Sequence, residues 1–203
     1  MDKWIFFDMG TTLIDETEAY NHRIRDMIYG TNITFEEFDK KRIALAKEGF
    51  DGNSAAIEYF GLSKTIWHTE DEIPYPNVHK ILDELCVKGY KLGIIANQNT
   101  GAMERLKNWK LYNYFAVIVT SSEAGCAKPN TKIFTIALNA AKCNPKESIM
   151  IGDRLDNDII PAKALGMKTI WIKNGLSKYQ DAKLGEDVAD YQIFSLDELL
   201  RIL

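Results

Sequence analysis

Two aspartates follow short apolar segments of the kind that form buried strands. Asp8 comes directly after Trp4 to Phe7, and Asp153 follows Ile149 to Ile151 and one glycine. In an open sheet of parallel strands, the carboxyl ends of the strands meet at one edge, and ligands bind there near the point where the strand order reverses. The two carboxylates are therefore expected to converge on that edge.

Converging carboxylates repel each other unless a cation or a proton lies between them. Hard oxygen ligands without histidine or cysteine favour Mg²⁺ over zinc. With such an ion bound, Asp8 keeps a free oxygen that can attack phosphorus, which divides a difficult hydrolysis into the formation and breakdown of an aspartyl-phosphate. The pattern predicts a Mg²⁺ cofactor and a small phosphorylated substrate.

Two further charged residues complete the predicted site. Lys128, just before Pro129, can neutralise carboxylate and phosphate charge as a point cation. Asp158 lies near the start of the helix expected after Asp153, where it can orient metal-bound water or pair with Lys128. We therefore expect catalytic roles for Asp8 and Lys128, and a place for Asp158 at the metal site.

Short β-rich apolar segments alternate with helical patterns, which is typical of a parallel sheet covered on both faces. The expected strands are Trp4 to Phe7, Leu92 to Ile95, Ala116 to Val119, Ile149 to Ile151 and Thr169 to Ile172. Helices are expected over Asn77 to Val87 and Thr131 to Lys142, and Ser195 with Glu198 predicts a capping box for a final helix. The predicted fold is a doubly wound α/β fold.

Residues 16–72 interrupt this alternation because they contain helical patterns and no convincing strand. Thr34 with Glu37 predicts a capping box for an amphipathic helix to about Glu48, and a shorter helix is expected over Ser54 to Phe60. We therefore expect a helical cap at 16–72, inserted into a Rossmann-like core of residues 1–15 and 73–203. Within the cap, Tyr20, Arg23, Trp67 and His68 could face a substrate, but packing or a solvated surface position is favoured for each, and His22 shows no metal-ligand spacing.

The order and context of the site residues resemble the four motifs of the haloacid dehalogenase-like (HAD) superfamily over nearly the whole chain. The matching segments are Asp8 to Leu13, Ile95 to Asn97, Gly125 to Pro129 and Gly152 to Asp158. The resemblance implies a Rossmann-like core with a helical cap, and metal ligation by Asp8, the backbone carbonyl of Gly10, and Asp153. It also implies that Lys128 supports the nucleophile and that the phosphoryl group binds near Thr12, Ala96, Asn97 and Lys128.

Two positions depart from the family pattern. Family phosphatases carry a second aspartate two residues after the nucleophile, which protonates the leaving group and then activates water, and this chain has Gly10 there. Ala96 stands where the family usually has a serine or threonine, so one charge-assisted hydrogen bond, worth roughly 1.5–3 kcal/mol, is absent. Asp15 and Glu16 are candidates to replace the lost acid after cap closure, but a hinge or cap-turn role is favoured for both.

The leading interpretation is a Mg²⁺-dependent phosphohydrolase, slow or confined to substrates whose leaving group needs little protonation. Haloacid dehalogenation uses the same aspartate without Mg²⁺, but Asp153 argues against it. Phosphonoacetaldehyde hydrolysis requires a reactive cap lysine, for which Lys40, Lys41 and Lys47 are available. The alternative from a different functional class is a binding or regulatory protein that keeps the phosphate and metal pocket but does not turn over a substrate.

Composition limits the partners. The 203 residues are 46% hydrophobic and 27% charged, with a formal net charge of −4 at pH 7, and the basic residues form no stripe that would suit a nucleic-acid backbone. No apolar segment has the length of a membrane span, and no signal-peptide pattern opens the chain. We therefore expect a cytoplasmic protein, monomeric or weakly dimeric. Its cysteines, Cys86, Cys126 and Cys143, are expected to be reduced and structural.

Overall fold

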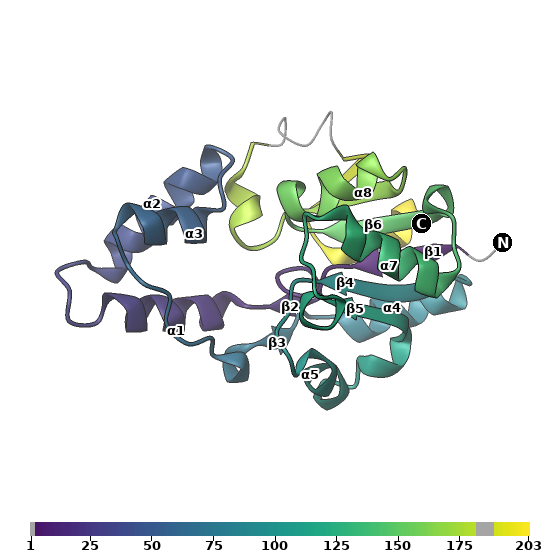
Figure 1. The fold of residues 1–203 in the computed structure, drawn as a ribbon, viewed down its shortest axis with the longest axis horizontal. Helices are drawn as coiled ribbons and strands as arrows, with labels where there is room; N and C mark the ends of the chain where they lie inside the picture. The colour runs from purple at the N-terminus through teal and green to yellow at the C-terminus, as the bar shows by residue number, and fades with distance from the viewer. Residues whose placement is uncertain (1–2, 182–188) are drawn as a thin grey trace.

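A six-stranded parallel sheet forms the larger body of the protein in the computed structural model, which describes residues 3–181 and 189–203 (Figure 1). The strands, in the order β5-β4-β1-β6-β7-β8 across the sheet, are β1 (Trp4–Phe7), β4 (Lys91–Ala96), β5 (Phe115–Thr120), β6 (Ser148–Gly152), β7 (Lys168–Ile172) and β8 (Tyr191–Ile193). Because β1 lies between β4 and β6, the end of β1 is at the point where the strand order reverses.

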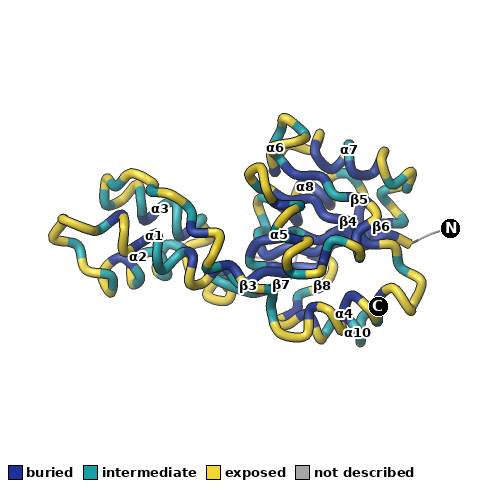
Figure 2. The backbone as a smooth tube through the Cα atoms, turned by 90° about the horizontal axis from the view of Figure 1, so that it is seen from below, coloured by how far each residue is buried: buried dark blue, intermediate teal, exposed yellow. Residues whose placement is uncertain are grey.

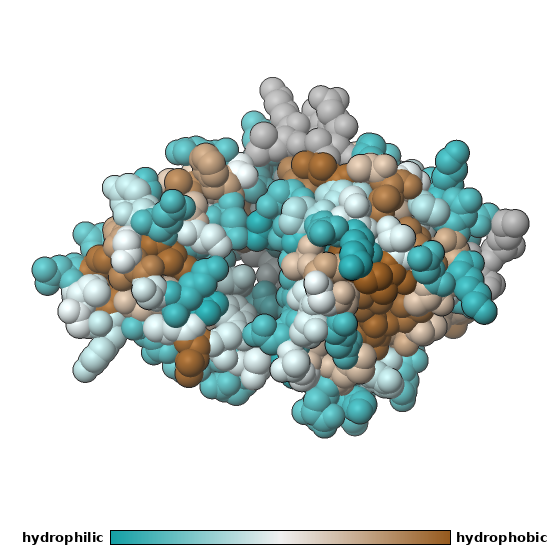
Figure 3. Space-filling model, viewed as in Figure 1, coloured by the Kyte–Doolittle hydropathy of each residue, from teal (hydrophilic) through white to brown (hydrophobic). Residues whose placement is uncertain are grey.

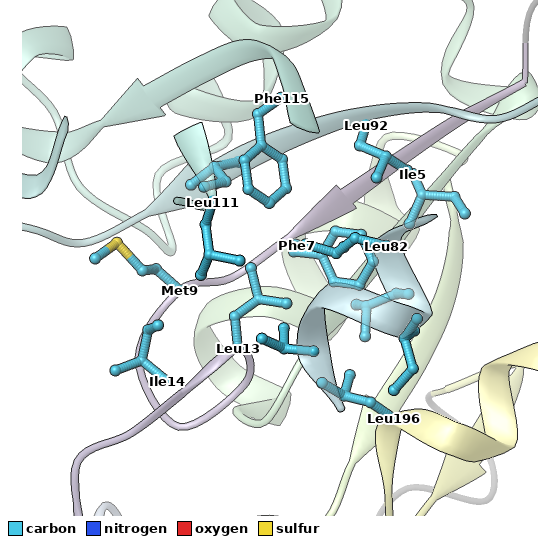
Figure 4. Close-up of a cluster of buried hydrophobic side chains, with 14 of the residues drawn as sticks. Ile5, Phe7, Met9, Leu13, Ile14, Leu82, Leu92, Leu111, Phe115 and Leu196 are labelled. Atoms are coloured by element: carbon cyan, nitrogen blue, oxygen red, sulfur yellow. The ribbon is translucent and has the colours of Figure 1, made fainter. Parts of the chain in front are cut away.

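Helices cover both faces of this sheet. One face packs against α4 (Val78–Val87), α5 (Ala102–Asn108) and α10 (Leu199–Ile202), and the other against α7 (Thr131–Ala141) and α8 (Ile160–Ala164). Side chains of β1 alternate between the two cores. Ile5 and Phe7 pack on the α4 side with Leu82 (Figure 4), whereas Phe6 packs with Phe134 of α7 on the other side. The predicted doubly wound α/β fold is confirmed.

Short helical segments connect these elements. They are α6 (Ser121–Ala124), η1 (Thr69–Asp71), η2 (Tyr112–Tyr114), η3 (Pro145–Glu147), η4 (Leu155–Ile159), η5 (Gly175–Tyr179) and η6 (Leu196–Glu198). The predicted capping box of Ser195 and Glu198 is present and opens η6, which leads into α10. Among the described residues, no helix combines the length and apolar character of a membrane span.

Residues 17–60 form a separate bundle beside the sheet (Figures 1 and 2). Its helices are α1 (Thr17–Ile28), α2 (Phe35–Lys47) and α3 (Gly52–Tyr59). They enclose a small core of their own around Phe38, Ile24 and Met27, and the capping box of Thr34 and Glu37 opens α2 as predicted. The helices of the expected cap therefore bury their apolar faces against one another instead of against the sheet.

Two chain crossings join this bundle to the sheet. β2 (Ile14–Asp15) pairs antiparallel with β3 (Ile73–Pro74), so the two crossings lie side by side close to the expected boundaries of the cap. Neither strand is predicted from the sequence, because two residues are too few to show an alternating pattern. Parts of the expected core, residues 1–2 and 182–188, lie outside the described residues.

Candidate active site

The loop after β1 folds back on itself. The backbone N–H of Ile14 donates to the carbonyl of Met9 at 3.1 Å, and that of Thr11 donates to the carbonyl of Ile14 at 2.7 Å. Thr11 adopts the left-handed conformation, with φ of 58°. This closed turn brings the chain back to its own start, so that Glu16 lies against Gly10.

Lys128 contacts the predicted nucleophile directly. Its Nζ lies 2.6 Å from Asp8 Oδ1 and 2.5 Å from Asp158 Oδ1, and its side chain is only 2% exposed. The side chain of Asn97 fixes the loop that carries Lys128, because it donates to the Lys128 carbonyl at 2.9 Å and accepts from the Lys128 N–H at 2.8 Å. Burial alone would lower the pKa of Lys128, but the carboxylates of Asp158 and Asp8 outweigh it and raise the pKa, so the cation is retained.

Three carboxylates converge beside Lys128. Asp8, Asp153 and Asp158 offer oxygens that lie within 4.8 Å of one another. Burial first, and then the charges of Asp158 and Asp8, raise the pKa of Asp153 well above its usual value. No described residue donates a hydrogen bond to the Asp153 carboxylate, while Trp171 Nε1 holds the Asp153 carbonyl at 2.7 Å. This all-oxygen cluster fits Mg²⁺, since a cation would relieve the repulsion that raises this pKa.

Asp158 lies in the π-helical turn η4 and is fully engaged by the protein. Its Oδ1 accepts from Lys128, and its Oδ2 accepts from the Arg154 N–H at 3.0 Å. A Cβ on Gly152 would lie 2.4 Å from the Asp158 carboxyl carbon, so this close approach requires glycine there. The geometry matches the pairing with Lys128 that the sequence predicts as one of two roles for Asp158.

Glu16 occupies the space that a side chain on residue 10 would fill. A Cβ on Gly10 would lie 2.2 Å from Glu16 Oε1, and the Thr11 hydroxyl donates to Glu16 Oε2 at 3.1 Å. Burial first, and then the charges of Asp8 and Glu72, raise the pKa of Glu16 to about 8. The backbone of Glu16 stands between β2 and α1, at the crossing where the sequence favours a hinge or cap-turn role, and its carboxyl group lines the cavity.

A cavity of about 320 Å³ lies over these residues, between the sheet and the helical bundle. Its lining includes the core residues Asp8, Lys128 and Asp153 and the cap residues Tyr20, Arg23 and Trp67. The space-filling view shows mostly hydrophilic residues bordering the hollow between the two bodies (Figure 3). The site is therefore polar and large enough for a small metabolite.

The cap residues at this cavity also pack on one another. Tyr20 and Trp67 meet edge to face at 4.8 Å between ring centroids, and the guanidinium of Arg23 lies 5.3 Å from the Trp67 ring centroid. Trp67 Nε1 donates to Glu72 Oε1 at 2.6 Å. Packing, the role favoured from the sequence, thus coexists with a place at the cavity wall.

The two histidines of the cap lie together. The rings of His22 and His68 stack at 3.5 Å between centroids, and Asp71 accepts from His22 Nδ1 at 2.8 Å. These three residues offer ligand atoms within 4.8 Å of one another, although His22 shows no ligand spacing in the sequence. The contact depends on the return of the chain from the cap and so leaves no local pattern.

Two of the residues predicted to bind the substrate do not line the cavity. Thr12 and Ala96 are fully buried and are not among the residues that line the cavity. Thr11 and the segment from Asn97 to Asn99 line it instead. This arrangement does not support contacts of the Thr12 and Ala96 side chains with a phosphoryl group. The sequence does not show which of the two adjacent threonines faces the cavity, because the turn of the loop decides it.

One ion pair bridges the helical bundle and the sheet. Arg154 Nη1 lies 2.6 Å from Asp51 Oδ2, and the two side chains are 34% and 29% exposed. Asp51→Asn keeps a side chain that can accept from Ser54 at the start of α3 and removes the charge, so we expect a loss of about 0.5–1 kcal/mol of cap-to-core attraction and a larger radius of gyration in small-angle scattering. Asp156→Asn is the matched control, since Asp156 pairs with the same arginine but belongs to the core and is 62% exposed. Equal radii for both variants would mean that the ion pair does not hold the two bodies together.

Comparisons with known proteins agree with this geometry. Residues 5–172 match the family model of the haloacid dehalogenase-like hydrolases, and the chain belongs to that family. It is 33% identical to the glyceraldehyde 3-phosphate phosphatase of Pyrococcus furiosus, over 99% of this chain and 92% of the relative, and 32% identical to that of Methanocaldococcus jannaschii, over 100% and 97%.

Solved structures show the same fold. A HAD phosphatase from Thermococcus onnurineus superposes with a TM-score of 0.68 at 27% identity, covering 98% of this chain and 97% of that one. A predicted phosphoglycolate phosphatase from Haemophilus somnus reaches a TM-score of 0.72 at 18% identity, with 99% and 97% covered. The family and the fold expected from the four motifs are confirmed.

Proposed function

We propose that this protein is a Mg²⁺-dependent phosphatase that hydrolyses a small phosphorylated metabolite through an aspartyl-phosphate on Asp8. The observation that carries the proposal is the 2.6 Å contact between Lys128 Nζ and Asp8 Oδ1 at a cluster of three carboxylates. This contact places a point cation against the carboxylate that the proposal assigns as the nucleophile.

The residues have separate tasks in this proposal. Asp8 attacks phosphorus, and Lys128 offsets negative charge on the nucleophile and on the phosphoryl group. Asp8, the backbone carbonyl of Gly10, and Asp153 would hold Mg²⁺, which supplies charge neutralisation for the phosphoryl oxygens when bound. Asp158 keeps Lys128 in place through the contact at 2.5 Å.

The substrate is proposed to be a small sugar phosphate. The cavity of about 320 Å³ is lined on the cap side by aromatic and cationic side chains, which favours a compact polar molecule over a nucleic acid. Relatives that match nearly the full chain are named glyceraldehyde 3-phosphate phosphatases, so triose phosphates are the first candidates. We propose that residues 16–72 act as a cap that closes over such a substrate and excludes water.

The alternative reactions find less support at this site. Among the cap residues that line the cavity there is no lysine for a Schiff base, and Lys41 instead lies 3.8 Å from the centroid of the Tyr59 ring. Asp153 and Asp158 beside Asp8 would repel the carboxylate of a haloacid. A screen for phosphate release from phosphorylated metabolites distinguishes the phosphatase from a non-catalytic binding protein.

That screen measures inorganic phosphate released from a panel of phosphorylated metabolites by wild type and Asp8→Asn, with and without Mg²⁺. Wild type should release phosphate only with Mg²⁺, and Asp8→Asn should release none. A binding protein would instead bind a phosphorylated ligand without releasing phosphate in either variant.

The metal assignment has its own test in Asp153→Asn. Loss of a charged ligand should weaken Mg²⁺ binding by at least the roughly 10- to 100-fold that removal of an outer-shell partner costs. Isothermal titration calorimetry without substrate measures this, with Asp156→Asn as the control because Asp156 is 62% exposed and pairs with Arg154. Equal affinities for wild type and Asp153→Asn would remove Asp153 from the metal site.

A further inference from the structure

We infer that the carboxyl group of Glu16, carried by the loop that leads into the cap, performs the proton transfers for which Gly10 has no side chain. This inference rests on the proposed phosphatase function. The acid/base group would then lie at the entrance of the cap, on Glu16, instead of on the loop after β1.

The Glu16 carboxyl group occupies the space beside Gly10. A Cβ on Gly10 would lie 2.2 Å from Glu16 Oε1 and 2.6 Å from its carboxyl carbon, so a side chain at residue 10 would have to displace the Glu16 carboxyl group from its present position. Gly10 is not among the residues with positive φ, so its backbone does not itself require glycine. Glycine at this position leaves open the space that the Glu16 carboxyl group occupies.

The Glu16 carboxyl group is buried at the wall of the cavity and has no cationic partner among the described residues. Glu16 is 8% exposed and lines the same cavity as Asp8, Lys128 and Asp153. Among the described residues, no cation forms an ion pair with Glu16, and the nearby Arg105 is engaged by Glu72 at 2.9 Å. A buried carboxyl group without a cationic partner is costly, which points to a functional reason for keeping it.

The structure also separates the two candidates that adjoin the first motif. Asp15 Oδ1 accepts from the backbone N–H of Thr17 at 2.9 Å, which is a turn contact at the start of α1. The Glu16 carboxyl group points back to the loop, where the Thr11 hydroxyl holds it. Of the two acids, Glu16 is the one that lines the cavity together with Asp8 and Lys128.

The proposed chemistry balances in two steps. An Asp8 carboxylate oxygen bonds to phosphorus, the bond from phosphorus to the leaving oxygen breaks, and that oxygen keeps the electron pair and takes the proton of the Glu16 carboxyl group. The Glu16 carboxylate then takes a proton from water, whose oxygen attacks phosphorus and releases the Asp8 carboxylate. One ester and one water give one alcohol and one phosphate, and Glu16 regains its proton.

The test exchanges the two positions and compares an alkyl phosphate, glyceraldehyde 3-phosphate, with an aryl phosphate, p-nitrophenyl phosphate. Glu16→Gln should lower kcat for the alkyl ester by roughly 10²- to 10⁴-fold, because the leaving alkoxide receives no proton. With the aryl ester it should release a burst of nitrophenolate, which leaves without a proton, and then turn over slowly, because hydrolysis of the shared aspartyl-phosphate lacks its base. Asp15→Asn, the neighbouring control, should stay within about 2-fold, since it lacks the contact to the loop. Mg²⁺ affinity should stay the same in Glu16→Gln.

The exchange variants sharpen the test. Glu16→Ala should lose alkyl phosphate turnover, and adding Gly10→Asp to it should restore at least about 10-fold, because a general acid returns to the vacated space. Gly10→Asp alone should gain nothing, since Glu16 fills that space. The inference is overturned if Glu16→Gln keeps alkyl turnover that Asp8→Asn lacks, or if Asp15→Asn loses as much as Glu16→Gln. If wild type shows no Asp8-dependent release from either ester, the proposed function fails, and the inference fails with it.

Discussion

Asp8→Asn is expected to lower phosphate release by on the order of 10⁴-fold or more, because an amide cannot form the covalent intermediate. The substitution keeps the shape of the side chain and leaves Lys128 paired with Asp158. The fold should therefore survive, which circular dichroism and thermal unfolding will show. Phosphate release is measured with saturating substrate and Mg²⁺.

The outcome of this experiment separates two explanations. If Asp8→Asn is folded, binds substrate and fails to turn over, the nucleophile is Asp8. A folded variant that keeps more than about a tenth of the wild-type rate would mean that water or another side chain attacks phosphorus, since loss of a nucleophile costs far more than that.

Lys128→Met is expected to reduce both activity and stability. Lys128 is a buried cation between Asp8 and Asp158, and removal of one partner of a buried ion pair costs roughly 3–5 kcal/mol because the other charge stays uncompensated. Those carboxylates raise the pKa of Lys128 in the folded state, so its contribution is present at neutral pH and is lost only above the ordinary lysine pKa of about 10.4. Urea unfolding at pH 7 measures the loss.

Two controls belong to this prediction. Lys132→Met removes an exposed lysine of α7 and should change stability by no more than about 0.5 kcal/mol. Addition of Asp158→Asn to Lys128→Met should recover part of the loss, and acidification should shrink it, because both reduce the uncompensated negative charge. A Lys128→Met protein as stable as wild type at pH 7 would contradict the ion-pair account.

Much of the fold is predictable because its strands are buried apolar segments. The five strands expected from such segments all occur, each within one residue of its predicted ends. β8 has only three residues, and β2 and β3 have two each, so their patterns are too short to recognise. Capping boxes are local and are predicted correctly at Thr34 and Ser195.

The site is predictable only as far as strand ends determine it. Asp8 and Asp153 follow neighbouring strands, so their approach follows from the order of the sheet. The position of Glu16 depends instead on hydrogen bonds that close the turn between Met9 and Ile14, and no sequence pattern marks them. The ion pair of Asp51 with Arg154 joins distant parts of the chain and is equally hidden in the sequence.

In the proposed mechanism, phosphate leaves by way of a covalent bond to Asp8. The stereochemical course at phosphorus tests for this bond, with a substrate whose phosphoryl group is chiral by oxygen isotopes. Attack by Asp8 and then by water comprises two in-line displacements, each of which inverts the configuration, so the account predicts net retention whether or not the intermediate accumulates. Net inversion would show a single displacement by water and would contradict the aspartyl-phosphate.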